Sequence, residues 1–116
     1  MDCVFCAIAR GQLRAEPIAE SERFMAFKDM KPICEGHTLI VPKQHFGTLL
    51  DLPDSWGQEL LKFTKQVGDY LLEQKLGDGF NVIMNTLPAA GQVVPHAHLH
   101  IIPRNEGDGI RFFVKK

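Results

Sequence analysis

Three of the chain's five histidines lie within five residues, at positions 96, 98 and 100, where they alternate with Ala97 and Leu99. Successive side chains of a β-strand point to opposite faces, so a strand through this segment would place all three imidazoles on one face. A neutral imidazole can bind a metal, move a proton or act as a nucleophile. An exposed face without chemistry would more often carry Lys, Glu or Thr, so the pattern predicts a functional site.

The spacing also predicts that the three rings have different tasks. Neighbours on one face of a strand are about 6.8 Å apart, and positions 96 and 100 are about 13 Å apart, so one ligand atom would not contact all three rings. Pro95 and Pro103 flank the segment and are predicted to mark the ends of the strand, because proline cannot donate to an interior ladder.

The alternating histidines and the Ile-Ile that follows them resemble the signature of the histidine triad (HIT) family of nucleotide hydrolases and transferases. Residues 36–45, Gly-His-Thr-Leu-Ile-Val-Pro-Lys-Gln-His, are similar to a second block of that family, and further matches extend over essentially the whole chain. The resemblance implies reaction at the α-phosphate of purine nucleoside phosphoramidates or dinucleoside polyphosphates through a covalent nucleotidyl-histidine. It also implies a homodimer that joins two sheets into one.

His98 is the candidate nucleophile, because an imidazole can attack phosphorus with one nitrogen while the proton on the other is held, often by a backbone carbonyl. His100 and His37 are candidates for stabilising the equatorial phosphate oxygens or for carrying the leaving-group proton. His37 would reach the triad if its strand is a neighbour of the triad strand. Taken singly, His37 and His45 would each more often be a surface or hydrogen-bonded core histidine.

Cys3 and Cys6 form a Cys-x-x-Cys pair at the start of a predicted short helix that Gly11 ends. The residues alone leave two packed thiols and half of a tetrahedral metal site equally open. The resemblance favours the metal site, since several HIT proteins are similar in pairing this motif with two histidines. It implies a closed, structural zinc site formed by Cys3, Cys6, His45 and His96.

Asp29 ends a predicted strand, and from one sequence it is most simply a turn former. Its Phe-x-Asp position matches the ribose-binding aspartate of the HIT family, so the resemblance implies a carboxylate that accepts from two ribose hydroxyls. The base would then lie among apolar side chains that the pattern alone would assign to the core: Val4, Phe5, Ile8 and Phe27.

The turn-rich segment 86–95 leads into the triad, and its backbone N–H groups could form an anion-binding nest. Asn85, Gly91 and Gln92 match substrate-contacting positions of the family, with Gln92 able to donate to a bridging or leaving-group oxygen. Val93 would contribute its backbone N–H. The phosphoramidase branch commonly has serine there to help protonate the leaving group, so Val93 argues against efficient phosphoramidate cleavage.

The remaining sequence supplies the elements that must position these residues. An α+β fold is predicted, with an antiparallel sheet of about five strands, one long helix and a short N-terminal helix. Strands are predicted at residues 18–20, 24–29, 36–42, 80–85 and 95–104. The long helix is predicted to begin at residues 51–54 with a capping aspartate, to carry an apolar stripe from Trp56 to Leu71, and to stop at Gly77.

The composition, 45% hydrophobic and 23% charged over 116 residues, is typical of one globular domain that spans residues 1–116. A net charge of −1 leaves no basic surface for nucleic acid, and no apolar run is long enough for a membrane span. The first residues lack the features of a signal peptide, which favours a cytoplasmic location. In the tail, Ile110, Phe112 and Phe113 are available to contact a partner subunit.

Two other functions stay open on the sequence alone. Metal-hydroxide chemistry would use three histidine ligands with water in the fourth position, although the cysteine pair can fill a closed site instead. The other is a purine-nucleotide sensor or scaffold with little turnover, and Val93 is the residue that motivates it.

Overall fold

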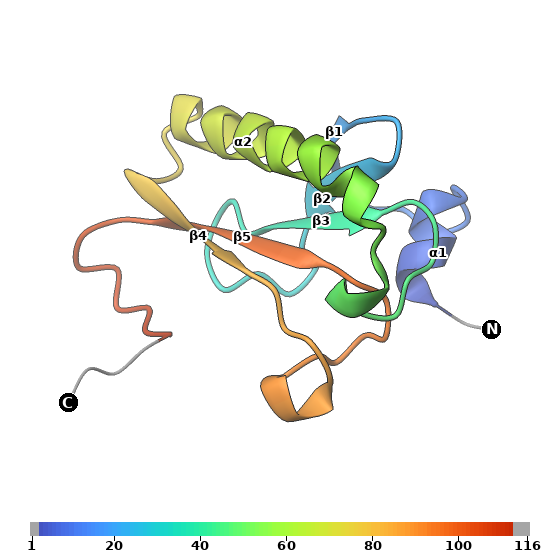
Figure 1. Cartoon of the computed structure of the whole chain (residues 1–116). Helices are drawn as coiled ribbons and strands as arrows, with labels where there is room; N and C mark the ends of the chain where they lie inside the picture. The colour runs from blue at the N-terminus through green and yellow to red at the C-terminus, as the bar shows by residue number, and fades with distance from the viewer. Residues whose placement is uncertain (1–2, 113–116) are drawn as a thin grey trace.

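The computed structural model describes residues 3–112 and contains one antiparallel sheet of five strands in the order β1-β2-β3-β5-β4. The strands in chain order are β1 Pro17–Glu20, β2 Phe24–Lys28, β3 Thr38–Pro42, β4 Gly79–Ile83 and β5 Leu99–Arg104. Two α-helices, α1 Val4–Ala9 and α2 Gly57–Glu73, pack on opposite faces of the sheet (Figure 1). The predicted α+β class, with one long helix and a short N-terminal helix, is confirmed.

Helix α2 covers one face because its apolar stripe meets the alternate residues of the strands. Phe63, Val67 and Leu71 are at most 1% exposed and form one core cluster with Phe24 and Ile40. The predicted stripe thus packs in the core, as is expected of apolar side chains at steps of three and four on one helix face.

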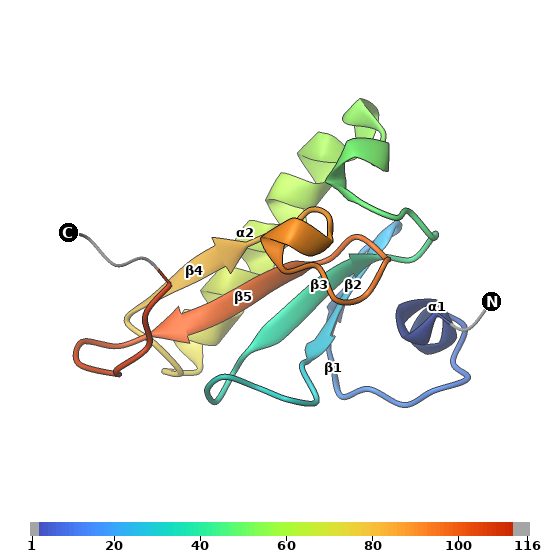
Figure 2. The same ribbon diagram turned by 90° about the horizontal axis from the view of Figure 1, so that it is seen from below.

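Helix α1 packs against the other face of the sheet. Its residues Phe5 and Ile8 cluster with Phe27, Leu39 and Val41, which point away from α2 along β2 and β3. Figure 2 shows this side, with α1 next to β2 and β3 and the short turn η3, Pro88–Ala90, on the same side of the sheet. Two short elements therefore flank the face on which the site is built.

The long helix begins later than predicted. At the predicted start the chain forms two 3₁₀ turns, Leu49–Asp51 and Asp54–Trp56, and α2 follows. The Asp51 carboxylate accepts from the N–H of Thr48 at 3.0 Å, so it closes the earlier turn and does not cap α2. Pro53 is extended, with φ −63° and ψ 135°, and it separates the two turns.

The strand that carries the triad begins later than predicted. β5 starts at Leu99, so His96 and His98 precede it in a bent segment. The N–H of Ala97 donates there to the carbonyl of Phe46 at 2.7 Å, a contact with the loop after β3 that replaces a strand ladder. Only the third histidine of the motif lies on the strand itself.

Pro103 lies inside β5, paired with Phe80 of β4, although it was predicted to end the strand. Its carbonyl accepts from Cys34 Sγ at 3.4 Å on the β3 side. The N and C=O of one strand residue face the same side, so the proline nitrogen also faces that side. Pairing of β3 with β5 has already ended at Ile101, so no ladder hydrogen bond is lost there.

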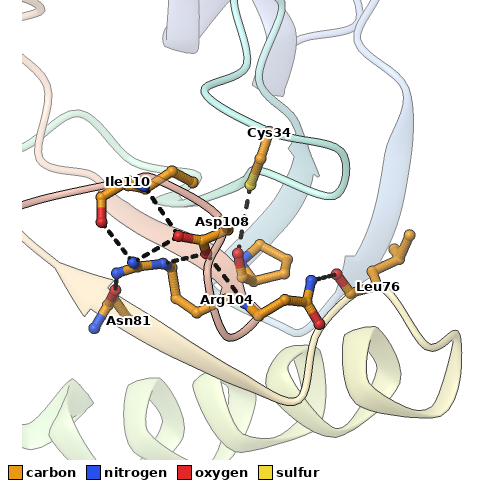
Figure 3. A network of polar contacts seen from close by, with 8 residues as sticks. Cys34, Leu76, Asn81, Arg104, Asp108 and Ile110 are labelled. Atoms are coloured by element: carbon orange, nitrogen blue, oxygen red, sulfur yellow. Dashed lines mark hydrogen bonds and ion pairs between the residues drawn. The ribbon is translucent and has the colours of Figure 1, made fainter.

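An ion pair fixes the loop after β5. The Arg104 guanidinium donates to both carboxylate oxygens of Asp108 at 2.8 and 3.0 Å, to Asn81 Oδ1 on β4 and to the carbonyl of Ile110 (Figure 3). Arg104 holds the pKa of Asp108 well below its usual range, helped by two backbone N–H groups. The guanidinium also lies 5.6 Å from the ring centre of Phe112, while the predicted contact of Phe113 falls outside the described residues.

Within residues 3–112, neither helix has the length and hydropathy that a bilayer crossing requires.

Gly68 provides a test of how α2 packs on the sheet. A Cβ added there would lie 2.4 Å from Cζ of Phe80, whereas a Cβ at Gly57, in the first turn of α2, would meet nothing within 4 Å. Gly68→Ala is expected to lower the free energy of unfolding by about 1–3 kcal/mol through overpacking, despite the better helix propensity of alanine. Gly57→Ala should leave it unchanged or raise it by up to about 1 kcal/mol. Urea denaturation measures both, and equal effects would contradict the packing.

Candidate functional site

The hydrogen bonds of His98 determine which ring nitrogen carries its proton. Nδ1 lies 2.7 Å from the backbone oxygen of His96 in a buried contact, and a carbonyl can only accept. Nδ1 is therefore protonated, and Nε2 keeps its lone pair. The ring of Phe5 on α1 packs against the imidazole of His98 with 5.0 Å between ring centres. Both α1 and the segment before β5 therefore fix the position of the His98 ring.

His96 has the opposite tautomer. Its Nε2 lies 3.0 Å from the carbonyl of Pro42 and donates to it, which leaves Nδ1 unprotonated. That nitrogen lies 3.2 Å from Cys3 Sγ and 3.5 Å from Cys6 Sγ. The Nδ1 of His45 lies 3.2 Å from Cys6 Sγ, and the four ligand atoms are all within 4.8 Å of one another.

This group of Cys3, Cys6, His45 and His96, here named the Cys₂His₂ cluster, fits a tetrahedral divalent metal. Ligand atoms about 2.0–2.3 Å from a zinc ion are about 3.3–3.8 Å from one another, close to the distances found. Burial, with the neighbouring Cys3 thiol, raises the pKa of Cys6, and a bound dication would oppose both effects. The cluster joins α1, the loop after β3 and the segment before β5.

His37 and His100 form a hydrogen-bonded pair in which His37 is the donor and His100 the acceptor. The N–H of Ile33 donates to Nδ1 of His37 at 3.1 Å, so the proton of a neutral His37 is on Nε2. Nε2 lies 2.9 Å from Nδ1 of His100 and 3.4 Å from Oδ2 of Asp29. His100 accepts at Nδ1, and its Nε2–H is left to donate elsewhere.

Both rings of this pair are neutral at pH 7. Burial lowers the pKa of His37, against the opposing effect of Asp29. Burial also lowers the pKa of His100 to about 4, and the neighbouring rings of His98 and His37 add to the shift. The hydrogen bonds that run from the Ile33 N–H through His37 to His100 therefore keep their donors and acceptors near pH 7.

Asp29, His37 and His100 also bring three ligand atoms within 4.8 Å, but their hydrogen bonds argue against a metal there. A metal on Nε2 of His37 would need the proton on Nδ1, where the N–H of Ile33 already points. The three side chains are better described as a proton-ordered relay.

The three triad histidines thus have separate surroundings. Among residues 3–112, no close group of metal-ligating side chains contains more than one of them. Metal-hydroxide chemistry would need three such ligands on one ion, and the geometry does not offer that arrangement.

A cavity of about 480 Å³ lies beside His98 and His100, a volume usual for small-molecule sites. Its lining includes ten residues assigned to the nucleotide site from the sequence: Val4, Phe5, Ile8, Phe27, Asp29, Asn85, Gly91, Val93, His98 and His100. His37 is 3% exposed and lies behind His100. A larger hollow of about 620 Å³ near the Arg104–Asp108 loop contains no histidine.

Asp29 has the turn-forming role considered from the sequence, and it also lines the cavity. Its Oδ1 accepts from the N–H of Lys31 at 2.9 Å, which is the turn-forming role. Its Oδ2 faces His37, and the residue lines the cavity. The N–H of Asp29 also donates to the carbonyl of His37 at 3.0 Å, so the end of β2 and the start of β3 place the two side chains together.

Gln92 does not line the cavity, in contrast to the expectation that its amide donates to substrate. It is 9% exposed, and Nε2 donates to the carbonyls of Gly47 at 2.7 Å and Val94 at 3.0 Å. Oε1 accepts from the N–H of Leu87 at 2.7 Å. Both amide hydrogens are thus used within the protein.

Four lining residues were not identified from the sequence: Met30, Lys31, Leu39 and Val94. Leu39 could have been found, because it pairs with Phe27 across β2 and β3 and shares its face. Met30 and Lys31 follow Asp29 in an irregular loop, where no periodicity predicts which side chains point inward.

Residues 10–107 match the family model of the HIT domain. The chain belongs to the HIT family. It is 35% identical to an adenosine 5'-monophosphoramidase of Candida albicans over 108 residues, which are 90% of this chain and 71% of that protein. It is 37% identical to an adenylylsulfatase of Arabidopsis thaliana over 107 residues, which are 92% of this chain and 54% of that protein.

Solved structures agree with this assignment. A zinc-bound histidine triad family protein from Mycobacterium smegmatis has a TM-score of 0.89 and 37% sequence identity, and the match covers 99% of this chain and 84% of that one. The HIT resemblance stated from the sequence is therefore confirmed. The relatives include nucleotide hydrolases, so hydrolysis of nucleotides is an activity of the family to which this chain belongs.

The lowered pKa of His100 predicts acid sensitivity of this HIT protein. Its value in the folded state, about 4, lies below the ordinary 6.5, so between these limits the unfolded chain binds more protons. The contribution of such a histidine to the free energy of unfolding is fully present above pH 6.5. It falls as the pH drops toward 4, by up to about 1.4 kcal/mol per pH unit.

The contribution of His100 is isolated by comparing wild type with His100→Asn in urea denaturation at pH 7, 6 and 5. The variant should show a shallower loss of stability in acid. Identical pH slopes for the two proteins would show that His100 titrates normally in the folded state.

Proposed function

We propose that this HIT protein is a hydrolase or transferase that acts on the α-phosphate of purine nucleoside phosphoramidates or dinucleoside polyphosphates, through a covalent intermediate on His98. The observation that carries the proposal is a buried imidazole whose Nδ1 proton is held by a carbonyl, beside a cavity of about 480 Å³. The named activities of two relatives, a nucleotide phosphoramidase and an adenylylsulfatase, support the bond class.

In the first step, the lone pair of His98 Nε2 forms a bond to the α-phosphorus. The bond from phosphorus to the leaving group breaks, and its electron pair goes to the leaving group. The ring becomes cationic, and the carbonyl of His96, 2.7 Å from Nδ1, stabilises that charge. In the second step, water attacks phosphorus and gives a proton to bulk solvent, the P–N bond returns its electron pair to Nε2, and the nucleoside monophosphate leaves.

The relay supplies a donor for the phosphate oxygens. The Nε2–H of His100 is not used by His37 or Asp29, and His100 lines the cavity next to His98, with 5.1 Å between ring centres. A fixed donor at the developing charge stabilises a phosphoryl transition state without reorganisation. His37 positions this donor by fixing the tautomer of His100.

The walls suggest how the nucleoside is held. Asp29 would accept from the ribose hydroxyls, and the base would lie between α1 and β2, against Val4, Phe5, Ile8 and Phe27. Asn85 and Gly91 would face the phosphate side. Val93 has no side-chain donor, so leaving groups that depart without protonation are favoured over amines.

We also propose that the Cys₂His₂ cluster holds a structural zinc ion. The two sulfurs and two imidazole nitrogens provide four ligands of the types that zinc prefers, with no open position for water. A relative of 37% identity is zinc-bound. When bound, the ion would supply a cross-link between α1 and the two loops that carry His45 and His96.

A homodimer that joins two sheets, and a cytoplasmic location, are further proposals. β4 is an edge of the sheet, and Val82 on it is 47% exposed, which suits pairing with a second copy.

The nucleophile is tested with His98→Ala and the more conservative His98→Gln. Both should lose at least ~10³-fold in turnover of adenosine phosphoramidate and diadenosine polyphosphates, because the covalent step has no other nucleophile. Rapid quench and intact-protein mass spectrometry should show an acid-labile nucleotidyl adduct on wild type and none on the variants.

An adduct on the His98 variants, or unchanged turnover, would refute the assignment. Tight binding of adenosine monophosphate to wild type, with negligible turnover of every substrate, would instead support the sensor or scaffold function. Calorimetry on the same samples separates these outcomes.

Zinc binding is tested by metal analysis of the purified protein. Wild type should contain about one zinc ion per chain, and Cys6→Ser or His45→Ala should contain much less and melt at a lower temperature. Cys34→Ser is the matched control, because the Cys34 thiol donates a hydrogen bond to the carbonyl of Pro103 and takes no part in the Cys₂His₂ cluster. Zinc content that is equal in all four proteins would contradict the assignment.

A further inference from the structure

Gln92 connects two loops through one buried side chain. Its amide donates to Gly47 at 2.7 Å and to Val94 at 3.0 Å, and accepts from the N–H of Leu87 at 2.7 Å. Gly47 lies in the loop after β3, two residues beyond His45 of the Cys₂His₂ cluster. Leu87 and Val94 belong to segment 85–94, the cavity loop.

Leu87 has a backbone conformation that only glycine adopts readily, with φ 74° and ψ 156°. Its side chain is 50% exposed, so burial contributes little to offset the strain. Its backbone is held on both sides by Gln92, since Gln92 Oε1 accepts from the N–H and the N–H of Gln92 donates to the carbonyl of Leu87 at 3.2 Å. The N–H of Ala90 also donates to the carbonyl of Leu87 at 3.0 Å, so the carbonyl is held by two backbone donors, whereas the N–H of Leu87 is held by the Gln92 side chain.

The turn at Leu87 lies between the residues of the cavity loop that line the cavity. Asn85, Gly91, Val93 and Val94 all line the cavity and lie on either side of Leu87 along the chain. Asn85 Nδ2 donates to the carbonyl of Gly91 at 3.5 Å, so the two ends of the turn also meet each other.

We propose that Gln92 is a positioning residue: it holds Leu87 in its strained conformation and fixes the cavity loop against the loop after β3, so that the phosphate side of the cavity is formed before substrate binds. The proposal rests on the proposed nucleotide function for its binding readout. It assigns Gln92 no contact with the reacting atoms, because both amide hydrogens are already donated.

The test uses Gln92→Ala, Gln92→Glu, Leu87→Gly and the double variant Gln92→Ala/Leu87→Gly, with Gln66→Ala on the exposed side of α2 as control. In Gln92→Ala, affinity for adenosine monophosphate by calorimetry should fall about tenfold, and KM should rise more than kcat falls. Gln92→Glu removes both donors to the carbonyls of Gly47 and Val94 and should lower the affinity in the same direction, but it keeps an oxygen that accepts from the Leu87 N–H. Hydrogen exchange at the Leu87 amide should therefore speed up at least tenfold in Gln92→Ala, and less in Gln92→Glu.

Glycine relaxes the strained backbone, so the loss caused by Gln92→Ala should be at most a third as large in the Leu87→Gly background. A direct contact of Gln92 with substrate would give the same loss in both backgrounds.

Two further results would overturn the proposal. One is Leu87 exchange in Gln92→Ala that is as slow as in wild type. The other is a loss of more than a hundredfold in kcat with unchanged nucleotide affinity, which would place Gln92 at the reacting atoms. If wild type itself binds no nucleotide, the proposed function fails, and the exchange measurement still decides the role of Gln92.

Discussion

The hydrogen bond from His98 Nδ1 to the carbonyl of His96, 2.7 Å long and buried, is the contact on which the site depends. One residue takes part in two systems, since the ring of His96 faces the cysteines while its backbone fixes the tautomer of His98. Any movement of the Cys₂His₂ cluster is therefore transmitted to the candidate nucleophile through one residue. Because the same cluster holds α1, it also positions Phe5 against both rings.

The periodic parts of the fold were predictable because burial on a regular element leaves a regular pattern. The apolar stripe predicted from Trp56 to Leu71 gave the core face of α2, on which Phe63, Val67 and Leu71 are buried. The start of α2 was wrong because Asp51 has two turns that it can cap, and only the backbone decides between them. Pro103 was misplaced because strand edges depend on where neighbouring strands end, which no local pattern records.

The candidate site was also predictable only in part. The family resemblance identified ten of the residues that line the cavity, and residue type alone pointed only to the histidines, whose chemistry few other side chains supply. Neither showed that the amide of Gln92 is used inside the protein, or that Ile33 sets the tautomer of His37. Such hydrogen bonds join residues through irregular loops, and a backbone donor such as Ile33 carries no signal in its side chain.

The late start of β5, at Leu99 and not at residue 95 as predicted, has a physical consequence for the site. In a regular strand the carbonyl of position 96 would lie in the plane of the sheet and pair with a neighbouring chain, while the ring at 98 would stand roughly perpendicular to that plane. The two groups could then not meet. Because β5 begins only at Leu99, the carbonyl of His96 is free to accept from the ring of His98. The departure from the alternating pattern is thus what allows the tautomer of His98 to be fixed, and local rules are expected to fail at functional sites of this kind.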